Sequence, residues 1–557
     1  MKYSFLFLFI SFQISSVAQQ WENAISFKYI SQYSNIRHVN DKDGNIYITG
    51  EFGPDQKYLE FPGFDYMTKG DLDIFLVKLD SNFLVKWVKV FGNTGKDMVT
   101  GIAIDNSGDL LICGYFTDSL TIGKQKLKSK GSSDFFLAKL DLLGDEIWIK
   151  SGGSEFADNN NHHSGGIFTD QNNSIYVSGL FADIDDHAPK AIAWFDSLSV
   201  KSFGGQDIFV AKYSESGKII WLKNFGSYSG DFGEISLVGK SIYLTGSADW
   251  QFHYDSLSLD NSYGGDIGFV LNMDTSGKIQ WVNAGFLTDW GSMFATSVTA
   301  DSNGNVYVVG MFNCIDLDCK FKFDNFYLEG IGGADIFIAK SDKNGKVKWL
   351  KRAGGFANDG PSKIIKKNNN HYIIVGSLTG GGFYEGKKIL SGIRSFILDI
   401  DSNGNPIFFE PCGTNGNNNC TDISLNYNGK LIVSGNNTGG TLTFDKLALP
   451  YLDRPSSLFI AKRDFVQKET DDLKNNIKSS IDFSPNPTDK YLNISHNDIN
   501  LRHCTLTVCR FDGKITFTKE ITSSSTSINT SDWPDGLYLF TFNNLKNRFT
   551  KQILIQH

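Results

Sequence analysis

At 557 residues and a formal net charge of −8, the chain exceeds one small domain and mixes acidic and basic residues along its length. Nucleic-acid binders cluster Lys and Arg to neutralise phosphates, so this charge pattern argues against a nucleic-acid partner. Aromatic residues make up 14% of the chain and 56 glycines stand against 11 prolines. That composition is typical of a soluble β-rich protein.

The N-terminus has the features of a secretory signal peptide. Lys2 precedes an apolar run at 5–12, and small residues at 16–18 offer a cleavage site before Gln19. The apolar run is too short to span a bilayer, and no later stretch is long and apolar enough to do so. We therefore predict that residues 1–18 are removed and that the mature chain has no transmembrane segment.

Two short elements then alternate seven times. One resembles Gly-x-x-Tyr-x-x-Gly and the other Asp-Ile-Phe-x-Ala-Lys-x-Asp. Repeats of this kind bury their apolar faces against their neighbours, so they predict one continuous architecture. The first element occupies 44–50, 108–114, 173–179, 240–246, 304–310, 370–376 and 429–435. The second occupies 73–80, 134–141, 207–214, 266–274, 335–342, 394–401 and 457–464.

Each unit is predicted to hold four strands joined by tight turns rich in Asp, Asn and Gly, residues that accept positive φ. The two repeated elements are the second and third strands, and an aromatic residue marks the fourth. The same phase in every unit predicts packing between sheets. The marker residues are Trp21, Trp87, Trp148, Trp221, Trp281, Trp349 and Phe408.

The order of the strands predicts how the array closes. The strand at Trp21 has no earlier strands before it, and the last unit has no tryptophan strand after it. Pairing the two leaves no open sheet edge. The predicted fold is therefore all-β, a seven-bladed β-propeller over residues 19–466 that the N-terminal strand closes.

The repeat resembles the bacterial SBBP β-propeller repeat. The resemblance rests on Trp-x-Lys-x-Phe-Gly at 221–226, on 298–310 and on Gly-Gly-x-Asp-Ile-Phe-x-Ala-Lys at 332–340. It implies the propeller fold, but the family has no general ligand or activity to carry over. In the last two units Arg394 and Ser457 replace the aspartate that begins the third strand.

The tail is predicted to be a separate domain. Residues 467–480 are polar and charged and form a linker, and residues 481–557 alternate short strands with turns, as in a small Ig-like β-sandwich. The tail resembles the type A C-terminal sorting domain of Bacteroidetes type IX secretion cargo. The matching positions are Pro485, Asn486, Pro487, Gly513, Lys514, Gly536 and Tyr538. The resemblance implies the type IX machinery as a partner and release at, or anchoring to, the surface of a Gram-negative cell.

Seven cysteines leave at least one without an intramolecular partner. Cys314 could pair with Cys319, and Cys412 with Cys420, in an oxidising compartment. Cys113 lies inside a repeat strand and is predicted to be a buried thiol.

Loops that lead from the fourth strand of one unit to the first strand of the next, here called junction loops, contain the first group of candidate ligand-binding residues. A recurring glycine is followed by Asp97, Asp158, Asp231 or Asp359, and one loop adds Asn160 and His162. Propeller geometry would gather these loops at one mouth of the central channel. Carboxylates and amides suit sugar hydroxyls or a cation, whereas the alternative is a set of capping and turn residues.

Three tryptophans outside the repeat phase form the second group. Trp194 and Trp250 lie in long segments between second and third strands, and Trp290 lies in a junction loop. Their rings could stack on sugar faces or simply pack. The Asp-x-Asn-Gly-Asn turns could hold calcium, but they lack the bidentate Glu of an EF-type loop. We therefore expect no metal site and no cofactor, with calcium the remaining candidate.

The sequence thus favours an exported, non-catalytic propeller that binds an extracellular glycan or a surface protein. A glycan hydrolase or lyase is the first alternative and would need several acids converging on the channel mouth. A purely structural or adhesive surface protein is the second. No catalytic residue can be named from the sequence.

Overall fold

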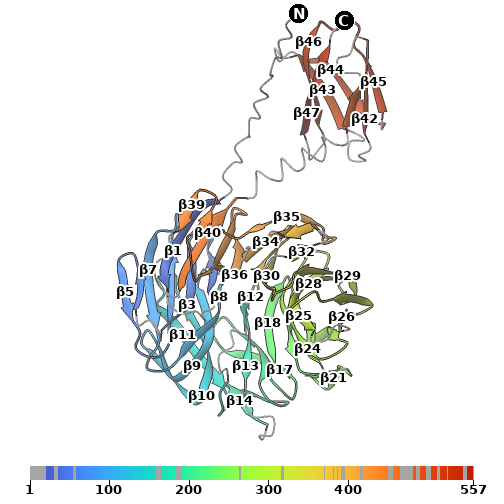
Figure 1. The fold of residues 1–557 in the computed structure, drawn as a ribbon. Helices are drawn as coiled ribbons and strands as arrows, with labels where there is room; N and C mark the ends of the chain where they lie inside the picture. Colours follow the sequence, from blue (N-terminus) through green and yellow to red (C-terminus); the bar gives the residue numbers. More distant parts are fainter. Residues whose placement is uncertain are drawn as a thin grey trace, which may run out of the picture. The chain divides into compact units, whose positions relative to one another are not determined.

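The computed structural model describes two compact units, one covering Gln19–Asp464 and another containing Phe465–His557. In the first unit it describes residues 21–29, 36–53, 58–158, 165–182, 190–262, 265–314, 319–368, 370–379, 382–384, 387–389, 395–413, 418–449 and 456–464. In the second it describes residues 481–484, 490–496, 504–510, 515–523, 525–543 and 548–555. These residues form strands and turns (Figure 1).

Antiparallel sheets with four successive strands follow one another through the first unit, and seven are found within its described residues. The first four sheets contain β2 (Arg37–Asn40), β3 (Ile46–Phe52), β6 (Asp73–Leu79) and β7 (Val85–Phe91); β8 (Asp97–Ile104), β9 (Leu110–Ile122), β10 (Gln125–Leu140) and β11 (Glu146–Gly153); β12 (Ile167–Thr169), β13 (Ile175–Phe181), β16 (Asp207–Tyr213) and β17 (Ile219–Gly226); and β18 (Phe232–Val238), β19 (Ser241–Ala248), β22 (Ile267–Asp274) and β23 (Ile279–Leu287).

The last three sheets follow the same order. They contain β24 (Gly291–Ala300), β25 (Val306–Cys314), β28 (Asp335–Ser341) and β29 (Val347–Gly354); β30 (Gly360–Asn368), β31 (His371–Ser377), β34 (Ser395–Ile400) and β35 (Pro406–Pro411); and β36 (Asn418–Leu425), β37 (Leu431–Asn437), β40 (Ser456–Arg463) and β1 (Trp21–Tyr29). Apart from the end of β9 and the first half of β10, the described residues of the second and third strands are almost wholly buried, which explains their continuous apolar sequences.

The N-terminal strand belongs to the last of these sheets. β1 pairs antiparallel with β40, in a register that sets Ala24 opposite Ala461 and Phe27 opposite Leu458. Figure 1 shows the two strands side by side, blue against orange. The first strands of consecutive sheets also contact one another in turn, from β2 through β8, β12, β18, β24 and β30 to β36, and β36 contacts β2.

Hairpins between the second and third strands extend the sheets outward. β14 pairs with β11 of the preceding sheet, where Trp194 stands opposite Gly153, and β20 and β26 pair with β17 and β23 in the same way. Each such hairpin therefore ties one sheet to the sheet before it. The hairpins are β4 (Tyr58–Phe61) with β5 (Phe64–Met67), β14 (Ile192–Phe195) with β15 (Leu198–Lys201), β20 (Gln251–Tyr254) with β21 (Leu257–Asp260), β26 (Lys320–Phe323) with β27 (Phe326–Glu329), β32 (Gly382–Tyr384) with β33 (Lys387–Ile389), and β38 (Leu442–Phe444) with β39 (Leu447–Leu449).

The repeated tryptophans also connect neighbouring sheets. The indole Nε1 of Trp148 donates to the carbonyl oxygen of Glu215, in the turn that joins the third and fourth strands of the next sheet, at 3.2 Å. Gly217 of that turn has φ of +77°, and a side chain on it would lie 3.1 Å from the Trp148 ring. Glycine is therefore required both by the turn and by the ring that covers it. Trp221, Trp281 and Trp349 make the same hydrogen bond.

The second unit consists of two antiparallel sheets around one core. One sheet contains β41 (Ile481–Ser484), β42 (Tyr491–His496) and β45 (Ser525–Asn529), and the other contains β44 (Ile515–Ile521), β43 (Cys504–Arg510), β46 (Gly536–Asn543) and β47 (Arg548–Ile555). Buried side chains from both sheets form the core, among them Leu492, Val508 and Phe540. Gly536 begins β46 and Tyr538 is buried, while Pro485, Asn486, Pro487, Gly513 and Lys514 lie outside the described residues. Among the described residues of the chain, no helix has the length and hydropathy needed to cross a bilayer.

Candidate functional site

The three tryptophans outside the repeat phase are all exposed to solvent. The exposed fraction is 49% for Trp194, 43% for Trp250 and 65% for Trp290. Trp194 lies in β14, Trp250 precedes β20, and Trp290 lies between β23 and β24. Only Trp250 stacks with another exposed aromatic residue in the contacts of the described chain, and this pairing identifies a candidate binding surface.

Four aromatic side chains form what we call the aromatic shelf: Phe203, Tyr228, Trp250 and His253. Tyr228, itself 45% exposed, stacks on Trp250 with ring centroids 6.2 Å apart and planes 22° from parallel. Below them His253 meets Tyr228 edge-on at 5.4 Å and stacks on Phe203 at 5.0 Å. Lys190 Nζ lies 5.8 Å from the Tyr228 ring centroid. The shelf thus presents two half-exposed aromatic side chains beside a cation.

Backbone packing holds the shelf in place. Tyr228 lies in the junction loop after β17, and Gly205 N donates to its carbonyl oxygen at 3.0 Å. A side chain on Gly204 would lie 2.3 Å from the Tyr228 Cα, so only glycine fits there. On the other side, Asn261 N donates to the Trp250 carbonyl oxygen at 2.7 Å, which closes the β20–β21 hairpin. Three loops of two neighbouring sheets therefore fix the rings before any ligand arrives.

The four junction-loop aspartates lie inside the structure. Asp97, Asp158, Asp231 and Asp359 are all at most 4% exposed. Each accepts a hydrogen bond from the backbone N–H four residues earlier, for example Asn93 N to Asp97 Oδ2 at 2.9 Å. This geometry favours the capping interpretation over a ring of sugar-binding carboxylates. Asn160 and His162 lie outside the described residues.

A second set of charged residues lies on the first strands. A cavity of about 240 Å³ is lined by β12, β18, β19, β24 and β30, with Glu234, Ser297 and Lys363 among its polar residues. Burial raises the pKa of the Glu234 carboxyl, while the positive charges of Arg37 and Lys363 oppose the rise. The Arg37 guanidinium donates to the carbonyl oxygen of Thr100 on β8 and to that of Thr421 on β36. The first strands thus carry a cross-linking charge network.

Asp422 is the centre of that network. Its carboxylate binds Lys363 Nζ and accepts a hydrogen bond from His38 N at 2.9 Å. The Lys363 ammonium and the nearby His38 and Arg37 side chains outweigh the effect of burial and lower the pKa of Asp422 to about 2. The pKa of Glu234 is raised and that of Asp422 is lowered, and such opposite shifts are what a catalytic acid–base pair needs. However, Asp422 is only 1% exposed and fully engaged, so its geometry supports stability rather than chemistry.

The Asp-Asn-Gly turns use their carboxylates on their own backbone. Asp41 Oδ1 accepts from Asp43 N at 2.9 Å and Asn45 N at 2.8 Å, and Oδ2 accepts from Asn45 Nδ2 at 2.7 Å. Asp301 and Asp401 make the same contacts. These hydrogen bonds explain the residue pattern by turn chemistry. No group of three or more His, Cys, Asp or Glu with metal-binding geometry occurs within the described ranges.

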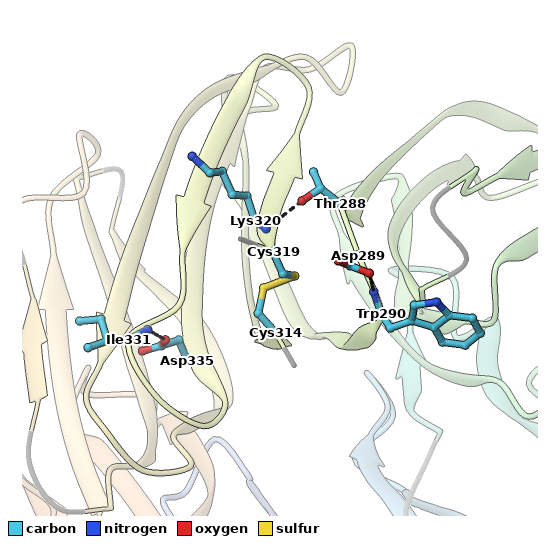
Figure 2. The surroundings of a disulfide bond; sticks show 8 residues. All are labelled: Thr288, Asp289, Trp290, Cys314, Cys319, Lys320, Ile331 and Asp335. Atoms are coloured by element: carbon cyan, nitrogen blue, oxygen red, sulfur yellow. Dashed lines mark hydrogen bonds between the residues drawn. A yellow bond between two sulfur atoms is a disulfide. The ribbon is translucent and has the colours of Figure 1, made fainter. Parts of the chain in front are cut away.

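Cys314 and Cys319 form a disulfide, one of the pairings that the sequence left open. Figure 2 shows it at the end of β25, with Lys320 N donating to Thr288 Oγ1 beside it and the Trp290 ring pointing away from it. The thiols of Cys113, Cys412 and Cys420 are buried and unpaired. The disulfide therefore joins the end of β25 to the residue before β26, next to the loop that carries Trp290.

Two family models match parts of the chain. Residues 483–556 match the secretion system C-terminal sorting domain, and residues 287–311 match a beta-propeller repeat. Both identifications made from the sequence motifs are confirmed. The sorting domain indicates a protein of Bacteroidetes that is handled by the type IX secretion machinery and is secreted or located at the cell surface.

More distant similarities were found to one curated protein and to solved structures. The chain is 27% identical over 218 residues to the uncharacterized WD repeat-containing protein L264 of Acanthamoeba polyphaga mimivirus, which is 34% of this chain and 16% of that protein. A Dyadobacter fermentans protein of unknown function aligns with 80% of this chain and 99% of its own, at 10% identity and a TM-score of 0.38. PorZ, a surface component of the Porphyromonas gingivalis type-IX secretion system, aligns with 96% of this chain and 100% of its own, at 11% identity and a TM-score of 0.15.

Sequence reasoning missed Phe203, Tyr228 and His253 as members of the candidate site. A usable signal was present, because Phe356 occupies the same place in its junction loop as Tyr228, two residues after the conserved glycine. The pairing with Trp250 could not be seen, since it depends on a hairpin of one sheet reaching the loop of another. The charge network around Asp422 was missed because its members lie on the first strands of different sheets, far apart in the sequence.

Proposed function

We propose that residues 19–466 form a seven-bladed β-propeller closed by β1, displayed outside the outer membrane, which binds an extracellular glycan. Support for the ring comes from the contacts of the first strands, which return from β36 to β2, and from the place of β1 beside β40. Support for display at the surface comes from the sorting domain. A closed ring removes the sheet edges that would otherwise pair with other chains.

The observation that carries the binding proposal is the exposed stack of Tyr228 on Trp250. Large ring faces are normally buried, because their burial is favourable by several kcal/mol in proportion to area. Here the Tyr228 and Trp250 side chains stay 45% and 43% exposed, and their backbones are fixed by neighbouring loops. The apolar faces of sugar rings bind to surfaces of this kind, and the nearby Lys190 offers a hydrogen-bond donor.

A surface protein is the second candidate ligand, and Phe356 is the observation that favours it. Its side chain is 81% exposed, at the loop position equivalent to Tyr228. Exposed apolar residues of this size mark protein contacts as well as ligand sites.

Loss of either exposed shelf ring should weaken recognition. We expect Trp250→Ala and Tyr228→Ala each to weaken glycan binding by about tenfold or more, since removal of one stacked ring costs about 1.4 kcal/mol. The full chain would be screened on a broad glycan array with and without calcium, and affinities for the glycans found would then be measured by calorimetry.

Trp194→Ala is the matched control, because Trp194 is as exposed as Trp250 but lies in β14, outside the shelf. Its affinity should equal that of the unchanged chain. Equal binding by all three variants would refute the shelf as the site. A negative array would instead favour the surface-protein candidate, and calcium-dependent binding would point to a cation at the site.

A further inference from the structure

Four of the connections between consecutive sheets contain a pair of buried aspartates, here called the acid pairs. In each pair one aspartate begins, or lies within, the third strand of a sheet, and the other lies in the junction loop or at the start of the next sheet. All eight side chains are at most 4% exposed. The pairs are Asp73 with Asp97, Asp134 with Asp158, Asp207 with Asp231, and Asp335 with Asp359.

One glycine sets the distance within each pair. A Cβ on Gly92 would lie 2.1 Å from Asp73 Oδ1 and 2.8 Å from Asp97 Oδ2, so both carboxyl groups rest against the same backbone atom. Gly153, Gly226 and Gly354 occupy the same position in the other pairs. The glycine recurs because any side chain there would displace the two carboxyl groups.

In most of these carboxyl groups one oxygen has no hydrogen-bond partner. Asp73 Oδ2 accepts from Lys69 N at 2.7 Å, and Asp97 Oδ2 accepts from Asn93 N at 2.9 Å. Oδ1 of each is buried without a hydrogen-bond partner, as are Oδ1 of Asp134, Asp207 and Asp335. In the third pair a Cβ on Gly226 would lie 2.1 Å from Asp207 Oδ1 and 2.7 Å from Asp231 Oδ2, so the two carboxyl groups are close neighbours. An ionised carboxylate has no hydrogen to donate, so a hydrogen bond between two such neighbours requires one of them to be protonated.

The charged groups near the pairs do not neutralise them by direct contact. Lys69 and Asp118 face the first pair, Lys130 the second, Lys190 and Asp249 the third, and Arg352 the fourth. Lys69 Nζ is directed to the Gly92 carbonyl oxygen, Lys190 to the Tyr228 ring, and Arg352 to the Glu329 carbonyl oxygen. Two buried like charges at short range strongly favour retention of one proton.

We propose that each of the first three acid pairs binds one proton at neutral pH, so that a carboxyl–carboxylate hydrogen bond fastens one sheet to the next, and that alkaline pH releases these fastenings. The neighbouring connections without a pair act as internal references. There Ser457 takes the place of the third-strand aspartate and donates to Asn437 O, which is a contact without a titratable group.

The direction of the pH effect follows from the pKa values. Burial is the largest cause that raises the pKa of Asp97 and Asp158 to about 8 and that of Asp359 to about 6, against 3.8 for an unperturbed aspartate. Between these values the folded chain holds more protons than the unfolded chain, so stability falls as the pH rises. The fastening is complete below about pH 4 and is lost as the pH passes through about 8.

The test counts the protons that the full chain releases when it unfolds at pH 6. Calorimetric unfolding in buffers of different ionisation enthalpy gives this number. We expect Asp97→Asn and Asp158→Asn each to lower the release by about one proton relative to the unchanged chain. Asp141→Asn, in a partly exposed turn, should leave it unchanged.

A release that is equal in the unchanged chain and in both paired variants would overturn the proposal. If the variants fail to fold, infrared spectra of the unchanged chain decide, because protonated carboxylic acids have a C=O band that carboxylates lack. Its presence at pH 7 with loss above pH 8 supports the proposal, and its absence at pH 7 overturns it. Stabilisation by calcium at pH 8 that is lost in Asp97→Asn would also overturn it, in favour of a cation site.

Discussion

Replacement of Asp422 by Ala is expected to lower the free energy of unfolding of the first unit by about 3–5 kcal/mol, the usual cost of removing one partner from a buried ion pair. The carboxylate is bound by Lys363 Nζ and by His38 N, on the first strands of the sixth and first sheets. Without it the Lys363 ammonium would lose the carboxylate that it contacts directly. Denaturant unfolding, monitored by tryptophan fluorescence, measures the loss.

The pH dependence of this loss separates the ion pair from simple packing. The pKa of Asp422 is lowered to about 2, so its contribution is complete above the unperturbed value of 3.8 and disappears as the pH falls through about 2. The difference between Asp422→Ala and the unchanged chain should therefore narrow from pH 4 downward. Burial lowers the pKa of His38 to about 4, so both proteins lose stability as the pH falls from 6.5 towards 4, before the range in which the Asp422 contribution changes.

Asp145→Ala is the control, since Asp145 is 61% exposed and pairs with Lys89 at 2.7 Å on the surface. Surface pairs of this kind contribute about 0–1 kcal/mol. If Asp422→Ala lowers the free energy of unfolding by no more than Asp145→Ala does, the network around Asp422 does not hold the first strands together. A loss that is constant from pH 7 to pH 2 would assign the effect to packing rather than to charge.

The repeat made most of the first unit predictable. Each repeated strand keeps the same residue pattern from sheet to sheet. The second strand must bury both faces, and the fourth must place an indole over the turn between the third and fourth strands of the next sheet. A single sequence records that pattern directly in residues such as Trp148 and Gly217. Strand order and the pairing partner proposed for β1 followed from the count of tryptophan strands alone.

The candidate site was less predictable, for two physical reasons. The residue type alone does not tell whether Asp97 or Trp250 faces solvent or a neighbouring residue. The structure shows that Asp97 is buried and that Trp250 is not. The hairpins also carry residues from one sheet to the edge of another, as β20 brings His253 beside Tyr228. A repeat pattern describes what the units share, whereas binding surfaces form from what they do not share.

The proposed ring closure leads to the second large effect. Phe27→Ala is expected to lower the free energy of unfolding by about 3–5 kcal/mol, as other buried Phe→Ala changes do. Phe27 lies on β1, is 3% exposed, and packs with its ring centroid 4.8 Å from that of Phe61. Glu22→Ala, on the exposed side of the same strand, should cost about 0–1 kcal/mol because it removes surface ion pairs with Lys430 and Lys462.

Hydrogen exchange shows whether that loss reaches beyond β1. Detachment of β1 exposes the edge of β40, so amides of β40 and β37 should exchange faster by about 100-fold, since each 1.4 kcal/mol corresponds to a factor of ten. Strands β43 and β46 belong to the other unit and should keep their rates. If only β1 itself exchanged faster in Phe27→Ala, β40 would not need its partner. The N-terminal strand would then pair with the last sheet without being needed to close the ring.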